Sequence, residues 1–316
     1  MLARHAEDLL WIGRYLERAE DTARLLDVTF HTALGESDEA AVDRAWTDLL
    51  AVLYLEDEAE GVARGDLARF LVGDRANQGS IVAAVSHARE NARGVREWLT
   101  LELWEEINAF HLELAGLHIA SAVATRPYAL CDLVRRRCET IIGIATATMP
   151  RTEGYQFLTL GQLLERAGIT ARLLAVWQQR LSAVERSGGF LEWSKLLRSA
   201  SAYDAYLREH RASFDGIRVL QFLLASRELP RSVLYCLEVA ERQLVSLSSG
   251  PYGRASLRAI GRVRSDVEFA EPASLAPDRL GAFLAELEGR IQGLGRVIED
   301  DFFRQGDFGL YAYETV

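Results

Sequence analysis

The sequence is poor in lysine, cysteine and proline, and each shortage excludes a kind of protein. Lys195 is the only lysine among 36 basic residues, so there is little room for lysine-based chemistry. Arginine instead favours bidentate pairing with carboxylates or phosphates. The 3 cysteines have neither metal-ligand spacing nor a disulfide framework, which predicts buried, reduced thiols. Only 6 prolines occur in 316 residues, a composition that suits long helices.

Long apolar runs and clustered positive charge are also missing. No uncharged apolar run reaches the roughly 18 residues that indicate a membrane-spanning helix. The N-terminal stretch carries charge from Arg4 onward and lacks the apolar core of a signal peptide. A net charge of −10 disfavours nonspecific binding to nucleic acid or to anionic membranes. These absences predict a soluble, cytoplasmic protein with no nucleic-acid or membrane partner.

What the sequence does contain is an internal repeat. The segment 13–28, GRYLERAEDTARLLDV, matches 161–176, GQLLERAGITARLLAV, at 11 of 16 positions. A fainter match pairs FLVGDRANQGSIVAAV from Phe70 with FLLASRELPRSVLYCL from Phe222. The offset is 148 residues for the first match and 152 for the second. Two matches at nearly one offset predict a first repeat over 1–148 and a second over 149–316, packed in one compact domain.

Apolar periodicity predicts helices in both repeats and no β-strand. Ser80 and Ser232 occupy the expected N-cap positions of one matched pair of helices. The other helices are expected over about 3–34, 38–55, 129–149, 153–185, 191–211 and 280–302. The predicted fold class is therefore all-α, a helical bundle built from two pseudo-symmetric repeats.

The leading helix of each repeat is apolar on most of its sides, which predicts that it is buried. Gly13 and Gly161 stand at matched places and would let neighbouring helices approach closely. The first helix carries an apolar stripe of Leu9, Ile12, Leu16, Ala19, Ala23 and Leu26. The second carries the equivalent stripe of Phe157, Leu160, Leu164, Ala167, Ala171 and Leu174.

Charged residues interrupt both leading helices at matched places. Glu17 and Arg24 are seven residues apart and project to nearly the same side, an arrangement that Glu165 and Arg172 repeat. The arginine that follows each glutamate points toward other neighbours. Because an unpaired buried charge costs several kcal/mol, all of these groups require partners. The candidate ligand-binding residues are Glu17, Arg18, Arg24, Glu165, Arg166 and Arg172.

Three interpretations of these charges remain open. In the first, buried ion pairs fix the packing of two similar halves. In the second, the carboxylates and guanidiniums converge on a pocket near the pseudo-twofold axis, which binds an anionic or zwitterionic ligand through arginine. In the third, the charges form a surface stripe that includes a dispensable Glu20–Arg24 pair, since Gly168 replaces that glutamate in the second repeat.

Motifs of well-known enzyme classes are absent from the sequence. Lys195 lacks the glycines of a phosphate-binding loop, and GLGRVI at Gly293 lacks the third glycine of a dinucleotide fingerprint. No Gly-x-Ser-x-Gly elbow and no Glu-x-x-His motif occurs. We therefore predict no cofactor and no metal. Glu17 and Glu165 could act as general acid and base only if the fold brings them together.

Several long motifs resemble those of the Alpha-E family, a bacterial all-helical family of unknown function named for its Glu-Arg motif. They are the paired LERA-x-x-TARLL segments, the opening MLARHAEDLLWIGRYLERAEDTARLLDV, and FLVGDRANQGSIVAAVSHARENAR. TMPRTEGYQFLTLGQLLERA and ELPRSVLYCLE resemble its second-half signatures, so the likeness covers essentially the whole chain. It marks the Glu-Arg dipeptides at 17–18 and 165–166 as the signature pairs. Gln162, where the first repeat has Arg14, departs from full equivalence of the halves.

The resemblance implies genomic neighbours for this protein and does not identify a reaction. Genes of the family lie beside, or fuse with, genes for circularly permuted ATP-grasp proteins and transglutaminase-like peptidases, which implies a role in making or modifying a peptide. We expect an accessory or substrate-binding protein, and not an enzyme on its own, with those two proteins as partners. A peptide or amino acid would occupy a Glu/Arg pocket between the repeats. The alternatives are a stand-alone enzyme with Glu17 and Glu165 as an acid–base pair, and a structural scaffold.

Overall fold

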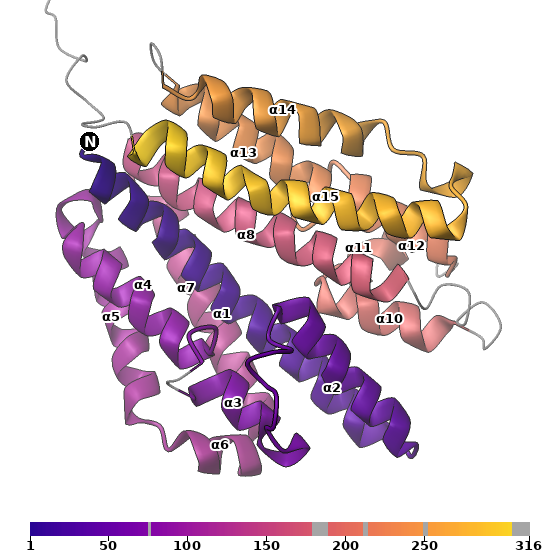
Figure 1. Ribbon diagram of the computed structural model, residues 1–316. Helices are drawn as coiled ribbons and strands as arrows, with labels where there is room; N and C mark the ends of the chain where they lie inside the picture. Colours follow the sequence, from indigo (N-terminus) through magenta and orange to yellow (C-terminus); the bar gives the residue numbers. More distant parts are fainter. Residues whose placement is uncertain (75–76, 179–188, 211–213, 249–251, 305–316) are drawn as a thin grey trace, which may run out of the picture.

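The protein is an assembly of helices around a central pair, α1 and α8 (Figure 1). α1 (Ala3–Gly35) and α8 (Glu153–Gln178) lie side by side through the middle of the molecule. The computed structural model describes residues 1–74, 77–178, 189–210, 214–248 and 252–304. Every regular element within these ranges is a helix, which confirms the all-α prediction.

Four helices of the first half form a bundle. α1 contacts α4 (Ile81–Gly94) and α7 (Pro127–Thr148), and α5 (Leu101–Gly116) completes the bundle by packing on both α4 and α7. α1 needs so many neighbours because it is apolar around most of its circumference. All members of its predicted stripe, from Leu9 to Leu26, are fully buried.

The second half builds a bundle with the same contacts around α8. α8 packs on α13 (Val233–Leu247) and α15 (Pro277–Ile298), and α14 (Arg254–Glu268) packs on both of those helices. The stripe of α8 is buried as predicted. The helices α4 and α13, which match in sequence, therefore pack on α1 and α8, which also match.

Shorter elements connect and flank the two bundles. α2 contacts both α1 and α8, and α10 contacts α1, so each bundle reaches across to the other. These elements are α2 (Glu39–Leu53), η1 (Arg64–Asp66), α3 (Leu67–Gly73), η2 (Arg96–Trp98), α6 (Ile119–Thr125), α10 (Phe190–Ser199), α11 (Tyr203–His210), α12 (Gly216–Ala225), η3 (Pro272–Ser274) and the π-helical turn η4 (Glu299–Phe303).

The two predicted serine caps are confirmed. The Ser80 hydroxyl accepts a hydrogen bond from the backbone N–H of Ala83 at 3.3 Å, and it begins α4. The Ser232 hydroxyl accepts from the N–H of Tyr235 at 3.1 Å, and it begins α13. Each cap satisfies a backbone donor that the first helical turn leaves unpaired, which explains why both helices begin there.

One predicted helix is wrong, because the segment expected over 191–211 is broken into α10 and α11. The break is at Ser201, whose backbone has a left-handed φ of 52° that cannot continue a right-handed helix. Periodicity did not reveal the break, since the buried side chains of Leu197 and Tyr206 continue the apolar pattern on both sides. The predicted end of the earlier helix, 179–185, lies outside the described residues.

The backbones of α1 and α8 touch at two glycines. A Cβ atom on Gly13 would overlap the carbonyl oxygen of Leu158, and one on Gly161 would overlap the carbonyl oxygen of Leu10. The two contacts are reciprocal, since Leu10 and Leu158 also stand at matched positions of the repeat. Only glycine fits such a close approach, which confirms the predicted role of both residues.

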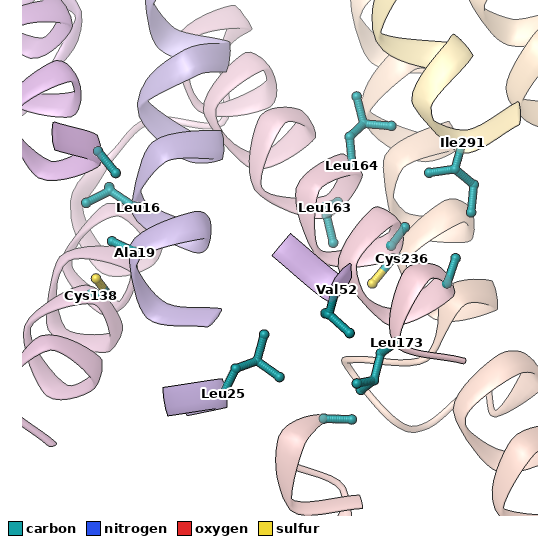
Figure 2. Packing of buried hydrophobic residues seen from close by; sticks show 14 of the residues in the cluster. Leu16, Ala19, Leu25, Val52, Cys138, Leu163, Leu164, Leu173, Cys236 and Ile291 are labelled. Carbon is teal, nitrogen blue, oxygen red and sulfur yellow. The ribbon is translucent and has the colours of Figure 1, made fainter. Parts of the chain in front are cut away.

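The core is continuous across the two halves. Leu16 of α1, Cys138 of α7, Leu163 of α8 and Cys236 of α13 belong to the same buried cluster (Figure 2). All three cysteines are free and buried, as predicted. Among the described residues no single helix is long and apolar enough to cross a membrane; α5 and α6 reach the required length and composition only together, with a bend of 82° between them.

Candidate functional site

The signature glutamates and arginines pair across the α1–α8 contact. Arg166 of α8 donates two hydrogen bonds to the carboxylate of Glu17 of α1, from Nε at 2.6 Å and from Nη2 at 2.8 Å. In the reverse direction, Nε of Arg18 donates to Glu165 at 2.7 Å. Each glutamate therefore binds the arginine of the opposite helix. The helical periodicity of a single segment cannot predict such a pairing between two helices.

A second donor stands one helical turn before each arginine. Gln162 donates through Nε2 to Glu17 at 3.1 Å, and Arg14 donates through Nε to Glu165 at 2.9 Å. Residues four apart share a helix face, so each pair of donors reaches the same carboxylate. The second repeat thus has Gln162 at the position matched to Arg14, which preserves the hydrogen bond to a glutamate but removes one positive charge.

Additional charges surround Glu17, and we call Glu17, Glu20, Asp21, Gln162, Arg166 and Arg231 the Glu17 cluster. Arg231, just before α13, lies 3.2 Å from Glu17 and 2.6 Å from Asp21 through Nη1, and its Nη2 also pairs with Glu20. The three carboxylate residues are each only 3% exposed. Their oxygens lie within 4.8 Å of one another, a spacing that would suit a metal. Arg231 already supplies the positive charge that this spacing requires, so we assign no metal there.

Two carboxyls of the Glu17 cluster, those of Glu17 and Asp21, have pKa values shifted in opposite directions. Burial alone would raise the pKa of Glu17, but Arg166 and Arg231 outweigh it and lower that pKa to about 2. For Asp21 burial prevails over Arg231, and with the neighbouring Glu17 charge it raises the pKa to about 7. The Oδ2 atom of Asp21 has no hydrogen-bond partner among the described residues.

The Glu165 cluster, which we define as Glu165, Arg14 and Arg18, is simpler and more open. The side chains of Arg14 and Arg18 are 21% and 29% exposed, and each binds Glu165 through Nε. Among the described residues, the terminal nitrogens of both guanidiniums have no hydrogen-bond partner. Burial opposes ionisation of Glu165, but Arg18 and Arg14 together lower its pKa.

The two clusters line separate cavities. The Glu165 cluster faces a cavity of about 560 Å³, whose charged lining is Arg14, Arg18, Arg296 and Glu165. The Glu17 cluster faces a cavity of about 410 Å³, whose charged lining is Glu17, Glu20, Glu139, Arg166 and Arg231. The first lining has an excess of positive charge and the second an excess of negative charge. Instead of the one shared pocket expected, the two signature carboxylates lie on either side of the α1–α8 contact.

The cavity beside the Glu165 cluster also has neutral polar groups. Tyr54, Gln78 and Gln292 belong to its lining, as does Thr22. The Thr22 hydroxyl is buried, and it has no hydrogen-bond partner among the described residues. A buried hydroxyl without a partner in a cavity wall is expected to bind a water or a ligand.

The structure does not bring Arg24 and Arg172 to these glutamates. Arg24 pairs with Glu20 one turn earlier and approaches Glu139 at 3.8 Å. Arg172 donates to the Ala51 carbonyl at 2.8 Å, lies 3.3 Å from Glu288 and contacts Glu56. Arg24 therefore pairs within its own helix, whereas the acceptors of Arg172 lie in or just after α2 and on α15. The Glu20–Arg24 pair, expected on the surface, is buried.

Arg231 is the main charged residue that the sequence reasoning missed. The fainter repeat places Gly79 opposite Arg231, and the stronger repeat places Gly168 and Ile169 opposite Glu20 and Asp21. The two extra acids and the extra base thus occur in only one of the two matched sets, and in the fold they contact one another. This joint asymmetry was a signal in the sequence that could have located the cluster.

Comparisons with known proteins identify a family whose model matches nearly the whole chain. A family model described as a predicted alpha-helical domain with a conserved ER motif matches residues 1–303. The chain is 26% identical to the uncharacterized protein Rv2567 of Mycobacterium tuberculosis over 321 residues, and to Mb2597 of Mycobacterium bovis to the same extent. Each match covers 93% of this chain but only 36% of the relative. The chain thus spans about a third of the length of these relatives. No solved structure matches.

Proposed function

The chain belongs to the Alpha-E family, and from that premise we propose that it is an accessory, substrate-binding protein of an ATP-grasp-linked system that makes or modifies peptides. Its ligand is an amino acid or peptide with a free carboxylate, bound beside the Glu165 cluster. Its partners are a circularly permuted ATP-grasp protein and a transglutaminase-like protein. Because ligation of this kind consumes ATP, the proposal places the protein in the cytoplasm.

The observation that carries this proposal is that Arg14 and Arg18 both bind Glu165 through Nε alone. Glu165 holds both guanidiniums through their Nε atoms, which leaves the terminal nitrogens available to a ligand. Terminal guanidinium nitrogens bind carboxylates with short, charge-assisted hydrogen bonds. Arg296 adds a third cation to the same lining, and Glu165 is the only carboxylate there. A single anionic group in the cavity would therefore be attracted by an excess of positive charge.

The size and the other lining groups of this cavity also support an amino-acid or peptide ligand. A volume of about 560 Å³ falls in the roughly 300–1,000 Å³ range of small-molecule sites. Thr22, Gln78 and Gln292 provide neutral hydrogen-bonding groups for a peptide backbone. Leu53, Leu164 and Ile291 provide apolar wall for a side chain.

The geometry favours binding over acid–base catalysis by the signature glutamates. Glu17 and Glu165 line different cavities, and the pKa of each is lowered by arginines that hydrogen-bond to it. A general acid that works near neutral pH needs a raised pKa instead. The acid–base alternative therefore gains no support, and the proposed role remains that of an accessory protein.

Binding is tested by calorimetric titration with glycylglycine, using glycylglycinamide as the control that lacks a carboxylate. We expect only the free acid to bind, and Arg18→Gln to weaken its binding about tenfold, the effect of one charge-assisted hydrogen bond. Arg258→Gln serves as the matched control, because Arg258 is exposed on α14 and has no ion pair among the described residues. Equal binding of acid and amide would reject the carboxylate site.

The accessory role is tested by purifying the protein with its neighbouring ATP-grasp protein. We expect a stable complex and a change in the rate of ATP-dependent ligation, measured as release of ADP. If the folded Arg18→Gln variant still forms the complex but no longer stimulates ligation, the Glu165 cluster contributes more than structure. Absence of both a complex and an effect on ligation would reject the accessory role.

A further inference from the structure

A third cavity, separate from those beside the two signature clusters, lies between α1, α7, α10 and α11. Its volume is about 400 Å³. It shares no lining residue with the cavity of the Glu165 cluster. The charged residues of its lining are Arg24, Asp27, Arg135, Lys195, Arg198 and Asp204. Four cations against two carboxylates give the wall a net positive charge in a protein whose total charge is −10.

The helix α10 brings the single lysine of the chain to this cavity. Lys195 is half-buried and pairs with Glu192 at 2.6 Å, a bond that uses one of its three ammonium hydrogens. One turn later on α10, Arg198 lies over the ring of Tyr203, with its guanidinium carbon 4.2 Å from the ring centroid. Among the described residues Arg198 has no ion-pair partner. The α10 wall thus offers two cations whose hydrogen-bonding capacity the protein does not use up.

The opposite wall holds two arginines, Arg24 and Arg135, that pair with acidic residues but each keep one donor unused. The Nε atoms of Arg24 and Arg135 are both buried without a partner among the described residues. Arg135 lies 3.3 Å from Asp132 and 3.9 Å from Asp27, and the latter distance is too long for a strong hydrogen bond. Burial, followed by repulsion from Arg231 and Arg135, lowers the pKa of Arg24. An anion in the cavity would offset this repulsion.

We propose that this cavity binds the phosphate group of a small phosphorylated metabolite. A phosphate monoester carries close to two negative charges and three acceptor oxygens, which suits several cations on opposite walls better than one carboxylate does. Arginine and lysine are the side chains that proteins use to bind phosphate. The volume leaves room for an organic moiety beside the phosphate, and Val28, Leu191 and Tyr203 of the lining offer it apolar and aromatic surface.

Access to the cavity is open from the α10–α11 side. Arg198, Ser201 and Asp204 are exposed, whereas Arg24 and Ser194 are buried. The exposed cation Arg198 therefore lies at the mouth of the cavity, and the buried cation Arg24 lies at its floor. A ligand could enter without any separation of α1 from α8.

The test is calorimetric titration of the full chain with inorganic pyrophosphate, with malonate as the dicarboxylate comparison. We expect saturable binding of pyrophosphate that weakens with added salt, and binding of malonate at least about tenfold weaker. Replacing the cations of α10, as Lys195→Gln and Arg198→Gln, should each weaken pyrophosphate binding about tenfold. The Arg258→Gln control should leave it unchanged.

Three results would overturn this proposal. The first is failure of pyrophosphate to bind the folded protein, and the second is binding that both α10 variants leave intact. The third is loss of pyrophosphate binding in Arg14→Gln, which would locate the anion at the Glu165 cluster. Because Arg198 is exposed, Arg198→Gln should unfold at the same temperature as the unmodified protein, so a loss of binding reports on the cavity.

Discussion

The Glu17 and Glu165 clusters use the same cross-helix ion pair but differ in what surrounds it. In the Glu17 cluster, Arg231 pairs with both Glu20 and Asp21, and the guanidinium of Arg166 donates twice to Glu17. In the Glu165 cluster, the matched positions hold Gly168, Ile169 and Gly79, so those positions add no further charge. The Glu17 cluster is therefore a buried ionic network whose arginines bind its own carboxylates, whereas the Glu165 cluster leaves donors unused beside its cavity.

The comparison shows that segments with matching sequences can differ in the surroundings and the role of their charged residues. Buried charges need partners, and the two extra acids of the Glu17 cluster occur together with an extra base that pairs with both of them. The Glu165 cluster has the same glutamate–arginine pair and a second arginine, Arg14, which gives it an excess of positive charge. The structural interpretation of the signature charges thus suits Glu17, and the ligand-binding interpretation suits Glu165.

The largest effect is expected from Arg231→Leu. This substitution leaves three nearly inaccessible carboxylates with one fewer cation, and breaking a buried ionic network in this way costs about 3–5 kcal/mol. The free energy of unfolding, measured with urea, should fall by that amount. A loss below about 1 kcal/mol would show that the Glu17 cluster is not the buried ionic network described above.

A loss of about 3 kcal/mol is expected from Gly161→Ala, and a similar loss from Gly13→Ala, since each added methyl would overlap a carbonyl oxygen of the facing helix. Gly289→Ala on α15 is the matched control, because nothing lies within 4 Å of its added methyl. That control should stabilise the helix by about 0.5–1 kcal/mol. Unequal losses at the two contact glycines would show that the reciprocal contacts differ in tightness.

A smaller, pH-dependent effect is expected at Asp21. Its folded pKa of about 7 lies above the ordinary value of 3.8, so it binds a proton more tightly when folded. Its contribution to stability is complete below the ordinary value and is lost as pH rises toward 7. Glu17 has the opposite sign, and its contribution is lost as pH falls from 4.5 toward 2.

Asp21→Asn should remove the first of these dependences. Thermal unfolding across mildly acidic to neutral pH should show the unmodified protein losing about 1–2 kcal/mol on the alkaline side, and the variant losing much less. The control is Ile169→Leu, because Ile169 of α8 is the residue matched to Asp21 of α1. This variant should show the same pH dependence as the unmodified protein. A variant that retains the full slope would assign it to another group.

The smallest effect on stability is expected from Arg14→Gln. Its side chain is partly exposed, and Arg18 still pairs with Glu165, so the free energy of unfolding should change by less than about 1 kcal/mol. Binding of glycylglycine should nevertheless weaken about tenfold. A large loss of stability with unchanged binding would reverse the assignment of roles to the two clusters.

Local features of the fold were predictable from the sequence, whereas pairings between distant segments were not. Ser80 and Ser232 mark helix starts because a cap depends on only a few neighbouring residues. The contact at Gly13 was predictable because only a missing side chain permits it. The Glu17–Arg166 pair depends on how two helices face each other, which periodicity leaves open. Arg231 lies 214 residues from Glu17, and only the asymmetry between the repeats pointed to it.

Because ion pairs cross the α1–α8 contact, we expect that neither half of the chain folds as a separate fragment. A truncated chain ending at residue 148 would retain Glu17, Glu20 and Asp21 but lose Arg166 and Arg231, so its longest helix would expose both an apolar seam and uncompensated acids. The complementary piece would carry surplus cations along α8 and before α13. Any excision of this domain from a longer polypeptide must therefore cut outside the first and last helices, and never at the midpoint that the repeat suggests.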